Sequence, residues 1–343
     1  MDGLRMKRRD KICAVTLTVL LVGMIVAMLN ANDANSSNSL RAKKSVYRSS
    51  LAGTWYPDDP EELRKQLQGF LQEAEIEPMS DIMALILPHA GYQYSGRTAA
   101  RALKALGRSY KRVIVLGPSH RVSLPDQLSV PQVSHFETPL GQVPLDRDFI
   151  RRLLEHGSLF KSKPIAHQGE HSVQIELPLL QVQLQAFQFV PIVVGQCSLP
   201  AIERAAVILK GLIDDQTLVV VSTDFTHFGN RFGYAPFSED IPGKLEELDM
   251  GAYDRIAALD APAFLQYQAE TEATICGRVP IAILLTMLDA SVQAQRIDYT
   301  TSGALTGDFA NSVSYLTAVF RGTWPGSTVV APSDEAPGAL TAT

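Results

Sequence analysis

Three uninterrupted apolar runs stand out along the chain, and each leads into a histidine. A run without polar interruptions is typical of a strand that is buried on both faces of a sheet. Pro88 ends the first strand because proline has no N–H to donate. Since the carboxyl ends of strands in open α/β sheets form the ligand-binding edge, the pattern predicts one site shared by these histidines. The runs are residues 82–87, 113–116 and 218–221, and the histidines are His89, His120 and His227.

Segments with helical periodicity alternate with the strands over most of the chain. The helix over residues 60–73 is predicted to be capped by Asp58 or Asp59, with Pro60 in its first turn. Residues 124–144 carry Pro and Gly without a helical period and predict an excursion that contains a hairpin. The alternation predicts an α/β fold with a central, mostly parallel or mixed sheet and helices on both faces. The other predicted helices are 97–106, 146–155, 173–184, 202–212, 243–258, 261–268 and 279–288, and the later strands are 187–194, 295–300 and 312–320.

The N-terminus predicts a membrane anchor. Basic residues precede an uncharged apolar run of about 18 residues, which is enough to span a bilayer with the basic end on the cytoplasmic side. A cleaved signal peptide is the alternative, although the run is long for one. We therefore expect the body outside the cytoplasm, in the periplasm or the extracellular space. The predicted organisation is a cytoplasmic basic segment 1–11, a transmembrane anchor 12–29, a flexible stalk 30–50, an α/β domain 51–321 and a disordered tail 322–343.

Charge and cysteine content narrow the function classes. The formal net charge is −5 and the body carries no basic stripe, which argues against a nucleic-acid partner. The three cysteines are too few for a disulfide scaffold. A body of roughly 270 residues is near the upper limit for one hydrophobic core. A small molecule or a peptide is the expected partner.

His89 and His120 together predict a metal site, because neutral imidazole suits iron, copper and zinc. One histidine after a strand is more often structural, but two histidines at the same edge of the sheet favour binding of one metal ion. Cys276 is a candidate third ligand. It precedes a predicted helix, whose positive dipole end lowers the pKa of a thiol. Its alternatives are a small buried hydrophobe or a disulfide with Cys197.

Further side chains complete the predicted site. Glu270 or Glu272 would replace the cysteine in a two-histidine, one-carboxylate triad. Asp224 and His227 are interpreted as a proton-handling pair, with His227 as the acid/base and Asp224 orienting it or binding metal. The alternative is that Asp224 caps a turn and His227 packs among aromatic rings. Contacts to an anionic or phenolic substrate are predicted, against ordinary loop packing, for Tyr92, Tyr94, Arg121 and His171, whereas a surface or structural role is expected for His135, His156 and His167.

Short motifs at residues 52–57, 88–96, 116–120, 170–172, 222–227, 275–277 and 299–303 carry a family resemblance. With them the chain resembles the Memo family, whose bacterial members include the AmmeMemoRadiSam system protein B. The resemblance implies a fold similar to that of the class III extradiol dioxygenases, which use non-haem iron(II). It also implies that iron or copper, with zinc as a further candidate, binds to His89, His120 and Cys276. His227, beside Asp224, then matches the acid/base histidine of those dioxygenases.

Cys276 stands where the dioxygenases have a carboxylate, and a soft thiolate shifts the metal preference toward copper or zinc. The first functional hypothesis is a metal-binding protein that performs redox- or oxygen-dependent chemistry on a small molecule. The second is a non-catalytic module that uses the pocket to bind a peptide or an anion. The third is redox sensing through Cys276, with or without Cys197.

Overall fold

Three parallel strands, β2 (Ile82–Leu87), β9 (Thr217–Ser222) and β3 (Arg112–Pro118), are neighbours in a mixed sheet. The computed structural model describes residues 44–324. Every residue of β2 and β9 is buried, which agrees with their uninterrupted apolar sequence. The predicted mixed sheet is therefore confirmed, and the three strands predicted to share one edge lie side by side.

The sheet continues on both sides of this centre. Beyond β2 it is antiparallel, with β12 (Asn311–Arg321) next to β2 and with β11 (Gln293–Thr301) and β10 (His227–Gly229) both paired to β12. Beyond β3, β8 (Gln188–Val194) is parallel to it. Two short strands, β4 (Leu128–Ser129) and β7 (Phe160–Lys161), complete that side.

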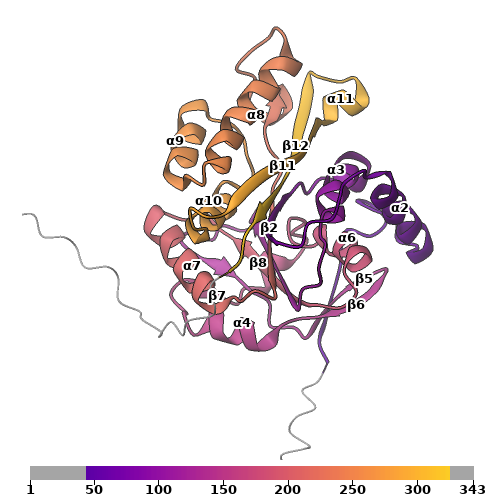
Figure 1. Cartoon of the computed structure of the whole chain (residues 1–343), viewed down its shortest axis with the longest axis vertical. Helices are drawn as coiled ribbons and strands as arrows, with labels where there is room; N and C mark the ends of the chain where they lie inside the picture. The colour runs from indigo at the N-terminus through magenta and orange to yellow at the C-terminus, as the bar shows by residue number, and fades with distance from the viewer. Residues whose placement is uncertain (1–43, 325–343) are drawn as a thin grey trace, which may run out of the picture. The chain divides into compact units, whose positions relative to one another are not determined.

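Helices cover both faces of the sheet, as predicted, in two groups (Figure 1). One group packs around α3 (Tyr92–Lys104), and the other around α10 (Arg278–Met287). The first also contains α2 (Pro60–Glu73) and α6 (Glu176–Gln183), and the second contains α7 (Leu199–Leu212), α8 (Ile241–Ala257) and α9 (Ala261–Thr271). Shorter helices are α4 (Arg147–Leu154), α5 (Pro164–His167), α11 (Ser302–Thr306) and the 3₁₀ turn η1 (Asn230–Phe232).

Helix starts show where local sequence sufficed and where it did not. Asp59 caps α2 by accepting hydrogen bonds from two backbone N–H groups, with Pro60 at the first position, as predicted. Helix α3, in contrast, begins at Tyr92, five residues before the predicted start at residue 97. Gly91 at its N-cap makes no side-chain hydrogen bond, so the sequence lacks the polar cap that usually marks a start.

A second, smaller sheet includes residues from the end of the predicted stalk. The predicted hairpin is confirmed as β5 (His135–Thr138) and β6 (Gly141–Pro144), which are antiparallel. A third strand, β1 (Val46–Arg48), pairs in parallel with β5. The end of the predicted stalk therefore belongs to the fold. A strand of three residues is too short to show an alternating pattern, so its partner alone defines it.

The predicted termini need two corrections. Trp324 lies within the predicted disordered tail but is buried, and its Nε1–H donates to the Thr217 carbonyl. The predicted anchor 12–29 lies outside the described residues. Among residues 44–324, no helix is both long and apolar enough to cross a membrane. No spanning helix among these residues supports the membrane-anchored, extracytoplasmic location expected for the body, and we withdraw that expectation.

Candidate metal centre

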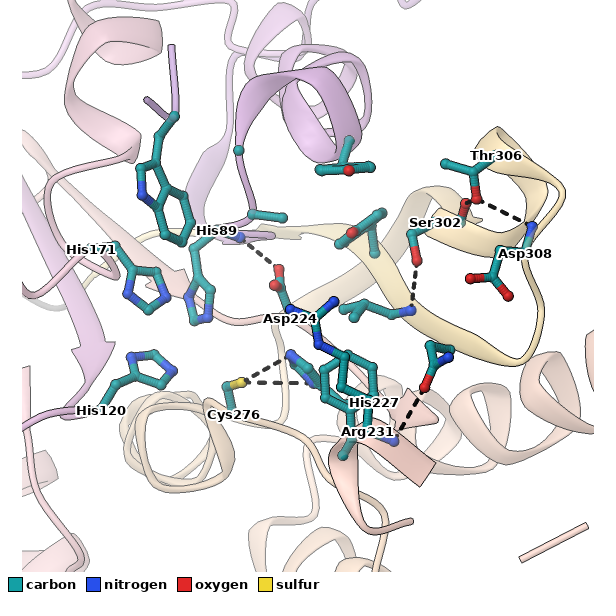
Figure 2. A pocket seen from close by; sticks show the side chains of 18 residues that line it. His89, His120, His171, Asp224, His227, Arg231, Cys276, Ser302, Thr306 and Asp308 are labelled. Atoms are coloured by element: carbon teal, nitrogen blue, oxygen red, sulfur yellow. Dashed lines mark hydrogen bonds between the residues drawn. The ribbon is translucent and has the colours of Figure 1, made fainter. Parts of the chain in front are cut away.

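The ends of β2 and β3 and the segment before α10 bring three potential ligands together (Figure 2). The ligand atoms of His89, His120 and Cys276 all lie within 4.8 Å of one another. The two imidazole rings are perpendicular, with centroids 5.1 Å apart. Strands β2 and β3 lie on either side of β9 in the sheet. His89 and His120 follow these two strands and therefore lie close together, although they are 31 positions apart in the sequence. The prediction that these three side chains converge is confirmed.

His89 presents one nitrogen that has no partner among the described residues. Its side chain is buried, with 1% of its surface exposed. Nδ1 lies 3.1 Å from Ser222 Oγ, and that hydroxyl donates to Glu176 Oε1 at 2.9 Å. Since the hydroxyl has one proton, it accepts from His89 Nδ1–H, which leaves a lone pair on Nε2. Nε2 is buried without a hydrogen-bond partner, so it is available as a ligand.

Burial lowers the pKa of His89 well below its ordinary value, and the nearby rings of His171, His120 and His227 lower it further. The imidazole therefore stays neutral near pH 7. A neutral ring can bind a metal ion, whereas a protonated ring cannot.

Glu170 orients His120. One carboxylate oxygen accepts from His120 Nδ1 at 2.8 Å, and the other accepts from the His120 backbone N–H at 2.7 Å. Burial alone would raise the pKa of Glu170, but the hydrogen bonds and charge of His120 and the Ser172 N–H lower it to about 2. The carboxylate is therefore ionised, and it leaves His120 Nε2 free. A carboxylate on the far nitrogen of a ligating histidine is a common arrangement around metals.

The protonation of Cys276 differs from the prediction. Burial raises the pKa of this thiol far above its ordinary value, and the charges of Asp224 and Glu170 raise it further. The helix dipole was expected to lower it, but desolvation and two carboxyl groups outweigh that effect. A bound cation would supply the missing charge compensation.

The alternatives to Cys276 as the third ligand, and the alternative disulfide of Cys276, do not agree with the structure. Cys276 and Cys197 are both free thiols, so the alternative disulfide does not form. Glu270 accepts from Gln266 on an exposed part of α9. Glu272 ends that helix in a left-handed backbone conformation. Neither acidic residue contributes to the groups of potential ligands or to the cavity beside them.

Asp224 and His227 do not form the pair that the sequence suggested. Asp224 Oδ1 accepts from the His89 backbone N–H at 2.7 Å. The His227 ring lies 3.1 Å and 3.2 Å, at Nδ1, from the carbonyls of Phe225 and Thr274. Backbone carbonyls, and not Asp224, therefore orient His227. Its Nε2 lies 3.8 Å from Cys276 Sγ.

Burial shifts the pKa of Asp224 and the pKa of His227 in opposite directions. Burial raises the pKa of Asp224 to about 7, although hydrogen bonds from the His89 and Ala90 backbone partly offset it. Burial lowers the pKa of His227. Asp224 and His227 can therefore both exchange protons near the cluster.

His171 joins the cluster through ring contacts that the sequence did not show. It stacks on His120 with centroids 4.3 Å apart, and on Trp55 at 4.6 Å. Burial is the main cause that lowers its pKa to about 4. His120, His171 and Glu170 form a second group of potential ligands, which shares His120 with the first. Trp55 was visible only as part of the motif at residues 52–57.

A cavity of about 650 Å³ opens beside the cluster and is lined by all four clustered histidines, Asp224 and Cys276. Tyr94 lines it as predicted, and the guanidinium of Arg231 points into it (Figure 2). Tyr92 and Arg121 do not line it. Tyr92 is buried because α3 begins there and directs its hydroxyl to the Ile175 carbonyl. The early helix start therefore removes Tyr92 from the predicted substrate contacts.

The remaining histidines lie apart from this cavity. His135, for which a surface or structural role was expected, is half-buried on β5. His167 is buried, and its Nε2 lies 3.2 Å from Ser129 Oγ.

The family model and the curated relatives agree over most of the chain. The family model described as Memo-like protein matches residues 48–319. A MEMO1 family protein of Methanopyrus kandleri is 32% identical over 288 residues, covering 79% of this chain and 97% of that protein. A MEMO1 family protein of Schizosaccharomyces pombe is also 32% identical, covering 80% and 99%. Human MEMO1 is 34% identical, covering 69% and 82%. A crystal structure of an uncharacterized Escherichia coli K12 protein has a TM-score of 0.46 at 13% identity, covering 69% of this chain and 99% of that chain.

Proposed function

This chain belongs to the Memo family, and from that premise we propose that it binds iron or copper through His89, His120 and Cys276. The observation that carries the proposal is His89 Nε2, a buried acceptor without a partner among the described residues. A buried polar atom left unsatisfied costs about 1–3 kcal/mol. A metal ion at this point would satisfy it together with the two other ligand atoms, which lie within 4.8 Å.

The donor set narrows the class of metal. Two imidazole nitrogens and one thiolate suit copper, zinc and iron, whereas magnesium and calcium prefer oxygen ligands. Zinc is a compatible occupant, but iron or copper would also supply one-electron and oxygen chemistry. The neutral state of His89 fits any of the three, because the ring does not have to lose a proton before it binds.

The cavity suits a small molecule as the reacting partner. Its volume of about 650 Å³ lies within the usual range for ligand pockets, about 300–1,000 Å³. His227 keeps its Nδ1 proton on two carbonyls and lines the cavity. We assign it the role of accepting a substrate proton at Nε2. Asp224 would hold or release a second proton near pH 7.

A non-catalytic binding module is the second candidate function. It is favoured by Arg231, which lines the cavity and supplies a permanent positive charge there. In this function the pocket would hold an anion or an acidic peptide, with or without a metal. Binding of such a ligand that is unchanged by chelators would favour the module over the metal-dependent function.

The test is metal content in the full chain purified without oxygen. We expect about one equivalent of iron or copper in the parent, and at least a tenfold loss in His89→Ala, His120→Ala and Cys276→Ala. Cys197→Ala and His135→Ala are matched controls, because both residues lie outside the cluster. If the three cluster variants retain as much metal as the parent, the proposal is wrong.

A further inference from the structure

We propose that Glu176 is a positioning residue for the metal site, which acts through Ser222 to hold His89 with its Nε2 lone pair exposed to the ligand cluster. The inference rests on the proposed function and deepens it. Glu170 holds His120 directly, whereas His89 has no carboxylate on its far nitrogen. The structure places Ser222 between His89 and the carboxyl of Glu176 instead.

The burial of Glu176 argues that its carboxyl has a specific role. It is the first residue of α6, and only 1% of its surface is exposed. Burying a carboxyl group away from water is costly unless it makes compensating hydrogen bonds. Burial raises the pKa of Glu176 well above its ordinary value, so the carboxyl is neutral near pH 7. Its Oε1 is then the carbonyl oxygen, which accepts from the fully buried Ser222 Oγ. An apolar side chain at the start of this helix would avoid the cost, so the carboxyl is best explained by the hydrogen bond.

The direction of this hydrogen bond decides which nitrogen of His89 carries the proton. A hydroxyl has one proton to donate and can accept at the same time. When Ser222 donates to Glu176, it accepts from His89 Nδ1–H, and Nε2 is bare. Without the acceptor on Glu176, the hydroxyl is free to donate to Nδ1. The proton of the neutral ring then lies on Nε2, where it blocks a metal ion.

No other contact of the His89 ring fixes which of its two nitrogens carries the proton. Its Nε2 has no hydrogen-bond partner among the described residues. The neighbouring rings of His120 and His171 contact it edge to face. Within residues 44–324 the hydroxyl of Ser222 is therefore the one hydrogen-bond partner of the His89 ring, and Glu176 sets the direction in which that hydroxyl donates.

The experiment compares Glu176→Ala, Glu176→Gln and Ser222→Ala in the full chain. The ring nitrogen signals of ¹⁵N-histidine show which nitrogen carries the proton, and the signals that disappear in His89→Gln identify His89. We expect the metal-free parent and Glu176→Gln to keep the proton on Nδ1, because a glutamine oxygen still accepts from Ser222. Glu176→Ala and Ser222→Ala should shift His89 toward the Nε2–H form.

Metal affinity is the second readout, measured by competition with a chelator. Loss of a group that orients a metal ligand typically weakens binding by about 10–100-fold, so we expect this loss in Glu176→Ala and Ser222→Ala. The Glu176→Ala/Ser222→Ala double variant should lose no more than either single variant, because both act on the same proton. Asp249→Asn is the matched control: Asp249 is a buried carboxyl that accepts from the Thr226 hydroxyl but contacts none of the three ligands.

The outcomes separate this inference from the proposed function. If His89 keeps Nδ1–H in Ser222→Ala and in Glu176→Ala, the inference is overturned, even if their metal affinity falls. If Glu176→Ala does not fold, Ser222→Ala decides the question alone. If the parent binds no metal, the proposed function fails, while the tautomer of the metal-free protein still decides whether the relay exists.

Discussion

Replacing Glu170 by glutamine should destabilise the protein and weaken its metal site at the same time. The buried carboxylate accepts three hydrogen bonds, from the His120 backbone N–H, from His120 Nδ1–H and from the buried Ser172 N–H. A glutamine keeps one oxygen and turns the other acceptor into a donor. The new amide group must then face at least one donor that the carboxylate used to bind.

Two estimates, both of which reflect the hydrogen bonds that Glu170 accepts, give a similar magnitude. Leaving one buried donor unsatisfied costs about 1–3 kcal/mol. The pKa of Glu170 falls from 4.5 to about 2, and at about 1.4 kcal/mol per unit this corresponds to about 3 kcal/mol for the ionised form. We therefore expect the free energy of unfolding at pH 7 to fall by about 1–3 kcal/mol.

The pH dependence gives the same prediction a second check. Because the folded-state pKa of Glu170 is lowered, its contribution to stability is fully present above pH 4.5 and is lost as the pH falls through about 2. The parent should lose this contribution over that window. Glu170→Gln cannot lose it, since the residue no longer titrates. The stability difference between the two proteins should therefore shrink as the pH is lowered from 4.5 to 2.

Urea unfolding of the metal-free proteins measures these differences, and chelator competition at pH 7 measures metal affinity, which should fall by about 10–100-fold. Glu73→Gln is the control. Glu73 forms an exposed ion pair with Arg97, so its loss should change stability by no more than about 0.5 kcal/mol. The reasoning is refuted if Glu170→Gln is as stable as the parent at pH 7 and its stability follows the same pH curve.

Two further predictions concern packing and a helix cap. In Gly117→Ala the new Cβ would lie 2.5 Å from Ser172 Oγ, so we expect about 1–3 kcal/mol of destabilisation and weaker metal binding, because the displaced segment carries Glu170. Gly69→Ala, whose Cβ would meet nothing within 4 Å, should instead be neutral or stabilising by up to about 1 kcal/mol, and equal urea midpoints for both variants would contradict the packing argument. Asp59→Ala removes the acceptor of two N–H groups at the start of α2 and should cost about 0.5–2 kcal/mol, without changing metal content; a variant as stable as the parent would show that the cap does not contribute.

The sequence alone determined the sheet centre and the histidines at its edge. The runs that became β2, β3 and β9 are apolar at almost every position, and a strand buried on both faces needs no information from elsewhere to be recognised. The motif spacing placed His89, His120 and Cys276 in one family pattern, and the structure brings their ligand atoms within 4.8 Å. The cap of α2 was equally local, since Asp59 and Pro60 adjoin the helix that they begin.

The tertiary structure decided what surrounds those ligands. Glu170 reaches His120 across 50 positions, and the contact of Ser222 with Glu176 spans 46. No local pattern encodes such partners. Burial and two carboxyl groups raise the pKa of Cys276, whereas a lower pKa was expected. Because α3 begins at Tyr92, the side chain of Tyr92 points into the hydrophobic core. Hydrophobic periodicity depends on neighbours in sequence, whereas desolvation, tautomers and hydrogen-bond partners depend on neighbours in space, which only the folded chain brings together.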